Sequence, residues 1–246
     1  MSSTRRLLVA LVVVATPSLA HAGRSRFGWL YGTEINPERG VEVESWIVEV
    51  NKQGPGKTDE TDFWWGPVIA LTPHLEIAIP VETEYHDDHD GTAPSTQVVR
   101  FGGEVRYRPQ SPDRIDAGPL ANLFRFGVKR MIDNRSGIRT ELDVVTSYEC
   151  GSVFALVDLG VIDEHVPGVD VFEIHSGAGV SVRLADGWRV GGETYGEITM
   201  TGDGVSWAVI GPTVGLTAGR FWGAATLGVG MFGVRDAGRI TFGLAL

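Results

Sequence analysis

The sequence of 246 residues has little cysteine, little charge and, after its first 22 residues, no long apolar run. Its single cysteine, Cys150, excludes a disulfide scaffold and any metal site built from several thiolates. Charged residues make up only 21%, and Asp and Glu outnumber Lys and Arg by 31 to 21. These values exclude a strongly basic nucleic-acid-binding protein, a coiled coil and a disordered chain.

The first residues have the pattern of an export signal. Arg5 and Arg6 precede an apolar stretch over 7–15, and an Ala-His-Ala cleavage site ends at Ala22. The apolar stretch is too short to span a bilayer, and no cysteine follows the cleavage site. The sequence therefore predicts a cleaved signal peptide over 1–22, with neither a membrane anchor nor a lipid anchor.

From Gly40 onward the chain divides into segments of alternating polarity that are separated by turn residues. Glycine, at 33 residues, and frequent Val and Thr disfavour helices. We expect twelve strands, with ten as the nearest alternative. Their ranges are 40–51, 61–72, 74–85, 96–109, 121–132, 137–148, 151–162, 169–184, 187–200, 204–218, 220–234 and 237–246.

One face of each strand is apolar, and the other is charged, small or hydroxylic. In the last strand Ile240, Phe242 and Leu244 oppose Arg239 and Thr241. A soluble sandwich and a membrane barrel both give this alternation. The strands are longer than those of most soluble sheets, which favours the barrel. The sequence thus predicts an all-β, transmembrane, antiparallel up-and-down β-barrel over 40–246, preceded by a periplasmic segment over 23–39.

The connections differ in length, which predicts an orientation. Outer-membrane barrels have short periplasmic turns and longer outer loops. The stretch 109–120 is long for a periplasmic turn and is interpreted as a short plug or an inserted turn. The tight turns lie near Pro73, 149–150, 186–187 and Gly219, and the outer connections are 52–60, 86–95, 133–136, 163–168, 201–203 and 235–236.

The polar faces carry many charges of both signs, which a barrel lumen can pair across strands. The candidate lumen-lining residues are Glu42, Glu44, Glu82, Glu84, Arg100, Glu104, Arg106, Arg125, Lys129, Arg139, Glu141, Asp143, Glu173, His175, Arg183, Arg189, Glu193 and Glu197. Tryptophan residues near strand ends are typical of the lipid–water boundary, because an indole is apolar but carries an N–H. The candidates for this position are Trp64, Trp65, Trp188, Trp207 and Trp222.

Motifs of catalysis and of metal binding are weak. His175 and Ser176 are adjacent on a strand, so their side chains point to opposite faces and cannot act together. The acidic run over 86–90 contains two His but has no fixed geometry, and we interpret it as a solvated loop. The sequence therefore predicts no enzyme, no metal site and no cofactor, although an outer-membrane lipid enzyme is kept as an alternative.

The stretch 31–46, YGTEINPERGVEVESW, reads E-x-x-P-x-R-G over residues 34–40 and leads into an acidic first strand with a Trp. It resembles the start of a family of uncharacterised Gram-negative outer-membrane barrels. The stretch 72–76, TPHLE, is similar to that family's first tight turn. These barrels are similar to the group of transporters associated with aromatic (phenol) degradation. The resemblance implies an outer-membrane barrel and the passage of small molecules.

The functional hypothesis is a channel or transporter in the cell outer membrane for small molecules, hydrophobic or aromatic ones included. Its expected partners are outer-membrane lipid, the barrel-insertion machinery and a small-molecule solute, with no nucleic acid. Besides the lipid enzyme, two alternatives are kept open. One is a structural barrel whose charges plug the lumen. The other is a soluble exported β-sandwich, which the acidic charge and the lack of a terminal aromatic residue favour.

Overall fold

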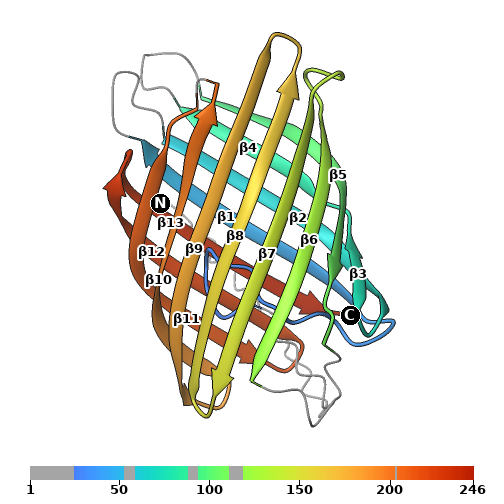
Figure 1. Cartoon of the computed structure of the whole chain (residues 1–246), viewed down its shortest axis with the longest axis vertical. Coiled ribbons are helices and arrows are strands. Elements are labelled where there is room, and N and C mark those ends of the chain that lie inside the picture. The colour runs from blue at the N-terminus through green and yellow to red at the C-terminus, as the bar shows by residue number, and fades with distance from the viewer. Residues whose placement is uncertain (1–24, 53–58, 88–93, 111–118, 203) are drawn as a thin grey trace, which may run out of the picture.

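Alternating polarity and frequent Val and Thr favour extended strands, which run along almost the whole described chain (Figure 1). A computed structural model describes residues 25–52, 59–87, 94–110, 119–202 and 204–246. The strands are β1 (Val41–Lys52), β2 (Asp59–Thr72), β3 (Leu75–Ala78), β4 (Val81–Asp87), β5 (Ser95–Tyr107), β6 (Leu120–Met131), β7 (Ile138–Cys150), β8 (Val153–Val166), β9 (Val169–Ala185), β10 (Trp188–Thr201), β11 (Trp207–Ala218), β12 (Phe221–Phe232) and β13 (Val234–Ala245).

The sheet closes on itself through antiparallel pairing of β1 with β13, where Glu42 lies opposite Ala245. The short strands β3 and β4 both pair with β2 and β5, so together they occupy one position in the wall. The thirteen segments therefore form a twelve-stranded barrel, and the predicted fold is confirmed. The expected continuous strand 74–85 is interrupted at Ile79 and Pro80, because proline has no N–H to donate to the ladder. The wall stays closed there, since the N–H of Ile79 donates to the carbonyl of Pro67 and the carbonyl of Pro80 accepts from Gly102, each at 3.1 Å.

Two of the expected outer connections are shorter than predicted. Strand β8 continues to Val166, so only Pro167 and Gly168 join it to β9, with Gly168 at a φ of 91°. Only Gly233, at a φ of 72°, joins β12 to β13. These left-handed conformations are accessible to glycine without steric cost. The predicted connections 163–168 and 235–236 are therefore mostly strand, while 111–118, the centre of the expected plug or inserted turn, lies outside the described residues.

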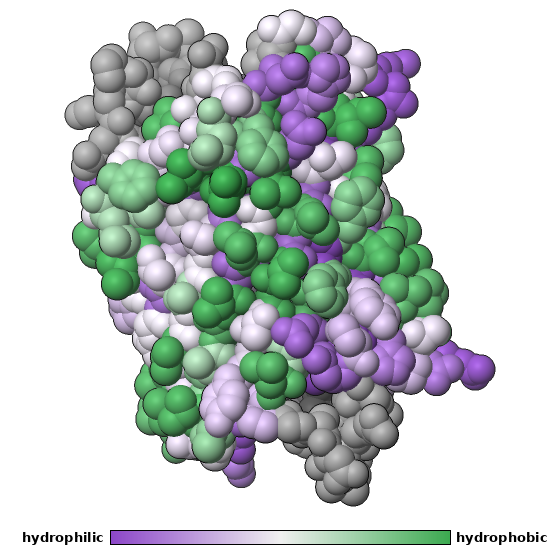
Figure 2. All heavy atoms as spheres, viewed as in Figure 1, coloured by the Kyte–Doolittle hydropathy of each residue, from purple (hydrophilic) through white to green (hydrophobic). Residues whose placement is uncertain are grey.

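The barrel is apolar outside and polar inside. Val157, Leu159 and Leu227 are exposed on the outer surface, where Figure 2 shows apolar side chains spread over the strands. Glu104 and Asp143 are fully buried inside. A soluble sandwich would bury its apolar face, whereas a membrane barrel turns it toward lipid. The described residues include no helix that is long and apolar enough to cross a membrane.

Candidate functional site in the barrel lumen

Inward-facing charges of β4 to β7 form ion pairs across neighbouring strands. Arg125 on β6 lies opposite Asp143 on β7, and its Nη2 is 2.8 Å from Oδ2 of Asp143. Its Nη1 lies 2.9 Å from Glu104 and 3.3 Å from Glu141. Lys129 Nζ lies 2.7 Å from the other oxygen of Glu141. The strand register thus places each buried cation within reach of two or three carboxylates.

Arg106 extends this charge network toward β1. Its guanidinium lies 2.5 Å from Glu104, 2.7 Å from Glu44 and 3.4 Å from Glu76. The remaining pairs of the network are Arg100–Glu82, Lys129–Glu82, Arg100–Glu164, Arg139–Glu141 and Arg139–Glu164. Buried charges are stable only when they are paired and hydrogen-bonded, so the network holds the inner faces of these strands in one arrangement.

Residues 25–36, which we call the inner segment, precede β1 and run inside the barrel. The carboxylate of Glu193 on β10 accepts hydrogen bonds from three successive backbone N–H groups of this segment. The donor-to-oxygen distances are 2.7 Å for Gly28, 3.2 Å for Trp29 and 3.3 Å for Leu30. The hydroxyl of Thr226 donates to the same carboxylate. One buried glutamate therefore provides the hydrogen-bond acceptor for three successive backbone N–H groups of the inner segment.

Further polar contacts hold the rest of the inner segment. Thr33 and Ser147 share a hydrogen bond of 2.6 Å between their hydroxyl oxygens. The backbone N–H of Asn36 donates to Glu76 at 3.0 Å, so the segment also contacts the charge network. Buried polar groups need such partners, and these two contacts provide them at Thr33 and Asn36.

The inner segment also buries apolar side chains against glycines of β9. Phe27 and Leu30 are fully buried and pack with Phe154 and other apolar residues in one cluster. A Cβ at Gly179 would overlap the ring of Phe27, and one at Gly177 would overlap Leu30. Of the predicted periplasmic segment 23–39, the structure places residues 25–36 within the lumen. Two sequence features together could have revealed this placement in the lumen. One is the apolar run FGWLY over 27–31, and the other is the pair of glycines on the inward face of β9.

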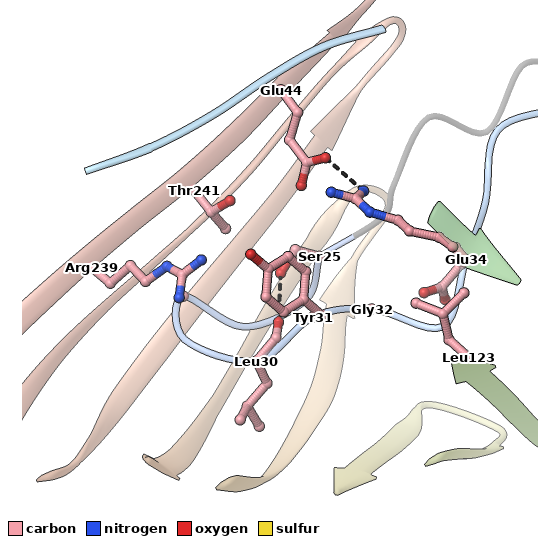
Figure 3. Close-up of a pocket in the computed structure, with 11 residues that line it drawn as sticks. Ser25, Leu30, Tyr31, Gly32, Glu34, Glu44, Leu123, Arg239 and Thr241 are labelled. Carbon is pink, nitrogen blue, oxygen red and sulfur yellow. Dashed lines mark hydrogen bonds and ion pairs between the residues drawn. The ribbon is translucent and has the colours of Figure 1, made fainter. Parts of the chain in front are cut away.

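Tyr31 lies among guanidinium groups in the lumen, and Figure 3 shows its ring near Arg239. Its ring centroid lies 4.0 Å from Arg125 and 5.5 Å from Arg239. Burial raises the pKa of its hydroxyl, although Arg125 and Arg239 act in the opposite direction. The space beside it, lined also by Glu44 and Leu123, is about 10 Å³, which is about the volume one water molecule requires. The described residues thus nearly fill the lumen at this level.

A larger cavity of about 290 Å³ lies between Tyr31 and the barrel end that carries the longer connections. One of its walls is aromatic, with Trp29 stacked on Tyr195 at 5.2 Å between ring centroids. Trp207 meets Trp29 edge-on at 5.4 Å, and Trp46 lines the same cavity. The charge network contributes another wall through Arg100, Lys129 and Arg139. The cavity therefore offers a flat apolar surface next to polar groups, as small-molecule sites do.

Three carboxylates that line this cavity have no ion pair among the described residues. They are Asp62, Glu173 and Glu197. Glu197 accepts hydrogen bonds from the indole N–H of Trp207 and the hydroxyl of Tyr195, each at 3.0 Å. These neutral donors leave its negative charge in place. The aromatic wall is therefore bordered by acidic side chains.

The structure places almost all of the predicted lumen residues on the inner face. Arg183 instead lies exposed at the rim, 3.1 Å from Glu149. Those that face inward are Glu42, Glu44, Glu82, Glu84, Arg100, Glu104, Arg106, Arg125, Lys129, Arg139, Glu141, Asp143, Glu173, His175, Arg189, Glu193 and Glu197. The candidate set did not include Asp158, nor Arg239, although Arg239 lies on the polar face of the last strand; both share the alternation of these residues and are also buried.

The tryptophans divide between the two faces. Trp65 and Trp188 are exposed on the outer surface. Trp64, Trp207 and Trp222 are buried inside the barrel, so their predicted place at the lipid–water boundary is wrong. Nearness to a strand end suggested that place, but the alternation of each strand turns these three indoles inward. The indole N–H of Trp222, for example, donates to luminal Glu42 at 2.7 Å.

Within the part of the chain that the structure describes, two further sequence features are not brought together into a catalytic site. His175 is buried in the lumen, whereas Ser176 is exposed on the outer surface, so the two side chains are separated by the barrel wall. Cys150 is an exposed free thiol at the end of β7. Most of the acidic loop 86–90 lies outside the described residues.

No family model and no curated protein matches this chain, whereas solved structures do. The translocator domain of the autotransporter NalP from Neisseria meningitidis is 13% identical, with a TM-score of 0.50 over 83% of this chain and 88% of that one. The NanC porin is 8% identical, with a TM-score of 0.54 over 84% of this chain and 100% of that one. At such low identity these similarities show the fold, which is that of an outer-membrane β-barrel.

Proposed function

We propose that this protein is a non-enzymatic transporter of small molecules in the outer membrane, and that the inner segment closes its lumen. The observation that carries the proposal is the division of the lumen into a cavity of about 290 Å³ and a level that Tyr31 nearly fills. A solute could enter the cavity from the end with the longer connections. Passage then requires the inner segment to move, while the charge network keeps the wall intact.

The proposal includes export with removal of the signal peptide over 1–22, and insertion of 40–246 by the barrel-insertion machinery into outer-membrane lipid. The solutes proposed are small neutral molecules with an apolar or aromatic ring. The stacked Trp29 and Tyr195 support this choice, because rings pack well against rings. The carboxylates Glu173 and Glu197 on the same side disfavour anions. The resemblance to barrels associated with aromatic degradation agrees with this solute class.

A disulfide between the inner segment and the wall tests whether the segment must move. The hydroxyl oxygens of Thr33 and Ser147 are 2.6 Å apart, so cysteines at both positions are close enough to bridge. We would prepare Thr33→Cys with Ser147→Cys in a Cys150→Ser background and reconstitute it in liposomes. We expect phenol uptake to be slow when the disulfide is formed and to recover on reduction.

Each single-cysteine variant serves as the matched control, since it cannot bridge and should be unaffected by the reductant. Uptake that is equal in the oxidised and reduced double variant would refute movement of the inner segment. Absence of flux in both states and in the unmodified protein would favour the alternative of a structural barrel with a plugged lumen. Benzoate is an anion, so replacing phenol by benzoate tests the effect of solute charge. Equal uptake of the two would contradict the proposal that Glu173 and Glu197 repel anionic solutes.

A further inference from the structure

Three buried side chains from adjacent strands meet beside the cavity. Asp143 on β7, Asp158 on β8 and His175 on β9 are 0%, 1% and 3% exposed. One ligating atom from each lies within 4.8 Å of the other two. The cross-strand register explains the meeting, because Asp143 and His175 both lie opposite Gly160 on β8. Any Cβ at Gly160 would overlap the imidazole, so this glycine lets the ring lie across β8 toward Asp143.

The imidazole of His175 is oriented in a way that leaves one nitrogen free. Its Nε2 lies 2.5 Å from Oδ1 of Asp143, and a carboxylate can only accept, so Nε2 carries the proton of a neutral ring. Its Nδ1 is buried and has no hydrogen-bond partner among the described residues. Histidine ligands of metal ions commonly donate their second N–H to a carboxylate, which directs the remaining lone pair at the metal.

Asp158 presents a second unpartnered ligand atom. Its Oδ1 is buried without a hydrogen bond, and the carboxylate has no ion pair among the residues that the structure describes. The backbone N–H of Tyr31 in the inner segment donates to this side chain. The nearby cation, Arg125, is already shared by Asp143, Glu104 and Glu141. An unpaired buried carboxylate is costly, and a cation at Oδ1 would remove that cost.

We propose that His175 and Asp158 bind a divalent transition-metal ion such as Zn²⁺, through Nδ1 and one carboxylate oxygen. An imidazole nitrogen with a carboxylate oxygen is a donor set that suits such ions better than Ca²⁺ or Mg²⁺. Asp143 acts as a positioning residue that holds the ring. Water from the cavity, which His175 also lines, completes the coordination. The site does not depend on whether the barrel transports solutes.

Calorimetric titration of the full refolded chain with Zn²⁺, and with Co²⁺ followed by its visible absorption, tests this site. Expected is one saturable ion per barrel that is lost in both Asp158→Asn and His175→Gln. Asp143→Asn should bind about 10–100-fold more weakly, as for other partners of a ligating histidine. The matched control is His165→Gln, because His165 also pairs with an aspartate, Asp170, but is exposed on the β8–β9 hairpin. It should bind like the unmodified protein.

The barrel's shift in gel mobility on heating shows which variants are folded. If His175→Gln does not fold, the comparison of Asp158→Asn with His165→Gln still decides, because Asp158 has no side-chain hydrogen bond or ion pair to lose within the described part of the chain. Binding that survives Asp158→Asn, or that is lost in His165→Gln, would overturn the proposal. So would an unmodified protein that binds neither Zn²⁺ nor Co²⁺, because the unpartnered atoms would then hold only a proton or water.

Discussion

Replacing Glu193 by alanine should release the inner segment from the wall. The carboxylate accepts hydrogen bonds from three backbone N–H groups and from the hydroxyl of Thr226. Each buried donor that loses its partner costs about 1–3 kcal/mol. Water entering from the lumen and the removal of a buried charge offset part of this cost. We therefore expect docking of the inner segment to weaken by about 3 kcal/mol, which raises its undocked population about 150-fold.

Hydrogen exchange followed by mass spectrometry measures this population directly. In folded protein, the amides of Gly28, Trp29 and Leu30 should exchange about 150-fold faster in Glu193→Ala, while strand amides of β6 and β7 stay protected. Glu193→Gln keeps an acceptor oxygen and should have a smaller effect.

The control is Glu197→Ala, on the same strand, because Glu197 contacts Trp207 and Tyr195 and not the backbone of the inner segment. Unchanged exchange at 28–30 in a folded Glu193→Ala barrel would refute the role given to this carboxylate. Equal acceleration by both alanine variants would show a general loosening of β10 instead.

Other predictions concern the wall. Val214→Arg, on the lipid-facing surface, should lower the free energy of folding into bilayers by about 2–4 kcal/mol, as measured by denaturant titration. Gly179→Leu should expel Phe27 and increase protease cleavage within the inner segment, whereas Gly103→Ala, where the added carbon meets nothing within 4 Å, should not. Arg125→Met leaves three buried carboxylates without this cation and should destabilise the barrel by about 3–5 kcal/mol, measured by the same titration.

Strand positions could be predicted because a period of two is a local property. Residues such as Val214 and Thr213 differ in polarity, and their alternation alone tells which one faces lipid. The break at Pro80 was also within reach, since proline cannot donate to a ladder. The indoles of Trp64, Trp207 and Trp222 were misplaced because their preference for the lipid–water boundary was given more weight than the alternation of their own strands.

The contacts within the lumen were harder to predict from the sequence, because they join residues far apart in the chain. Arg125 meets Asp143 only through the register of β6 and β7, and a shift of one residue would turn one of them toward lipid. The docking of Gly28 on Glu193 spans 165 positions and has no periodic signature. Sequence reasoning could therefore name the charges of the polar face without telling which of them are paired.

The distribution of these charges explains where the inner segment docks. Three of the buried cations, Arg106, Arg125 and Lys129, lie on β5 and β6. Asp158 lies on β8, which contains no Lys or Arg, and Glu193 lies on β10, where Arg189 is the one buried cation. Backbone N–H groups of the inner segment, including that of Tyr31, take the place of the missing cations on this side of the barrel. Undocking the segment would remove these donors and expose both carboxylates to the lumen. A barrel opened in this way is therefore more negative inside than the closed one, and its open state should favour cations over anions.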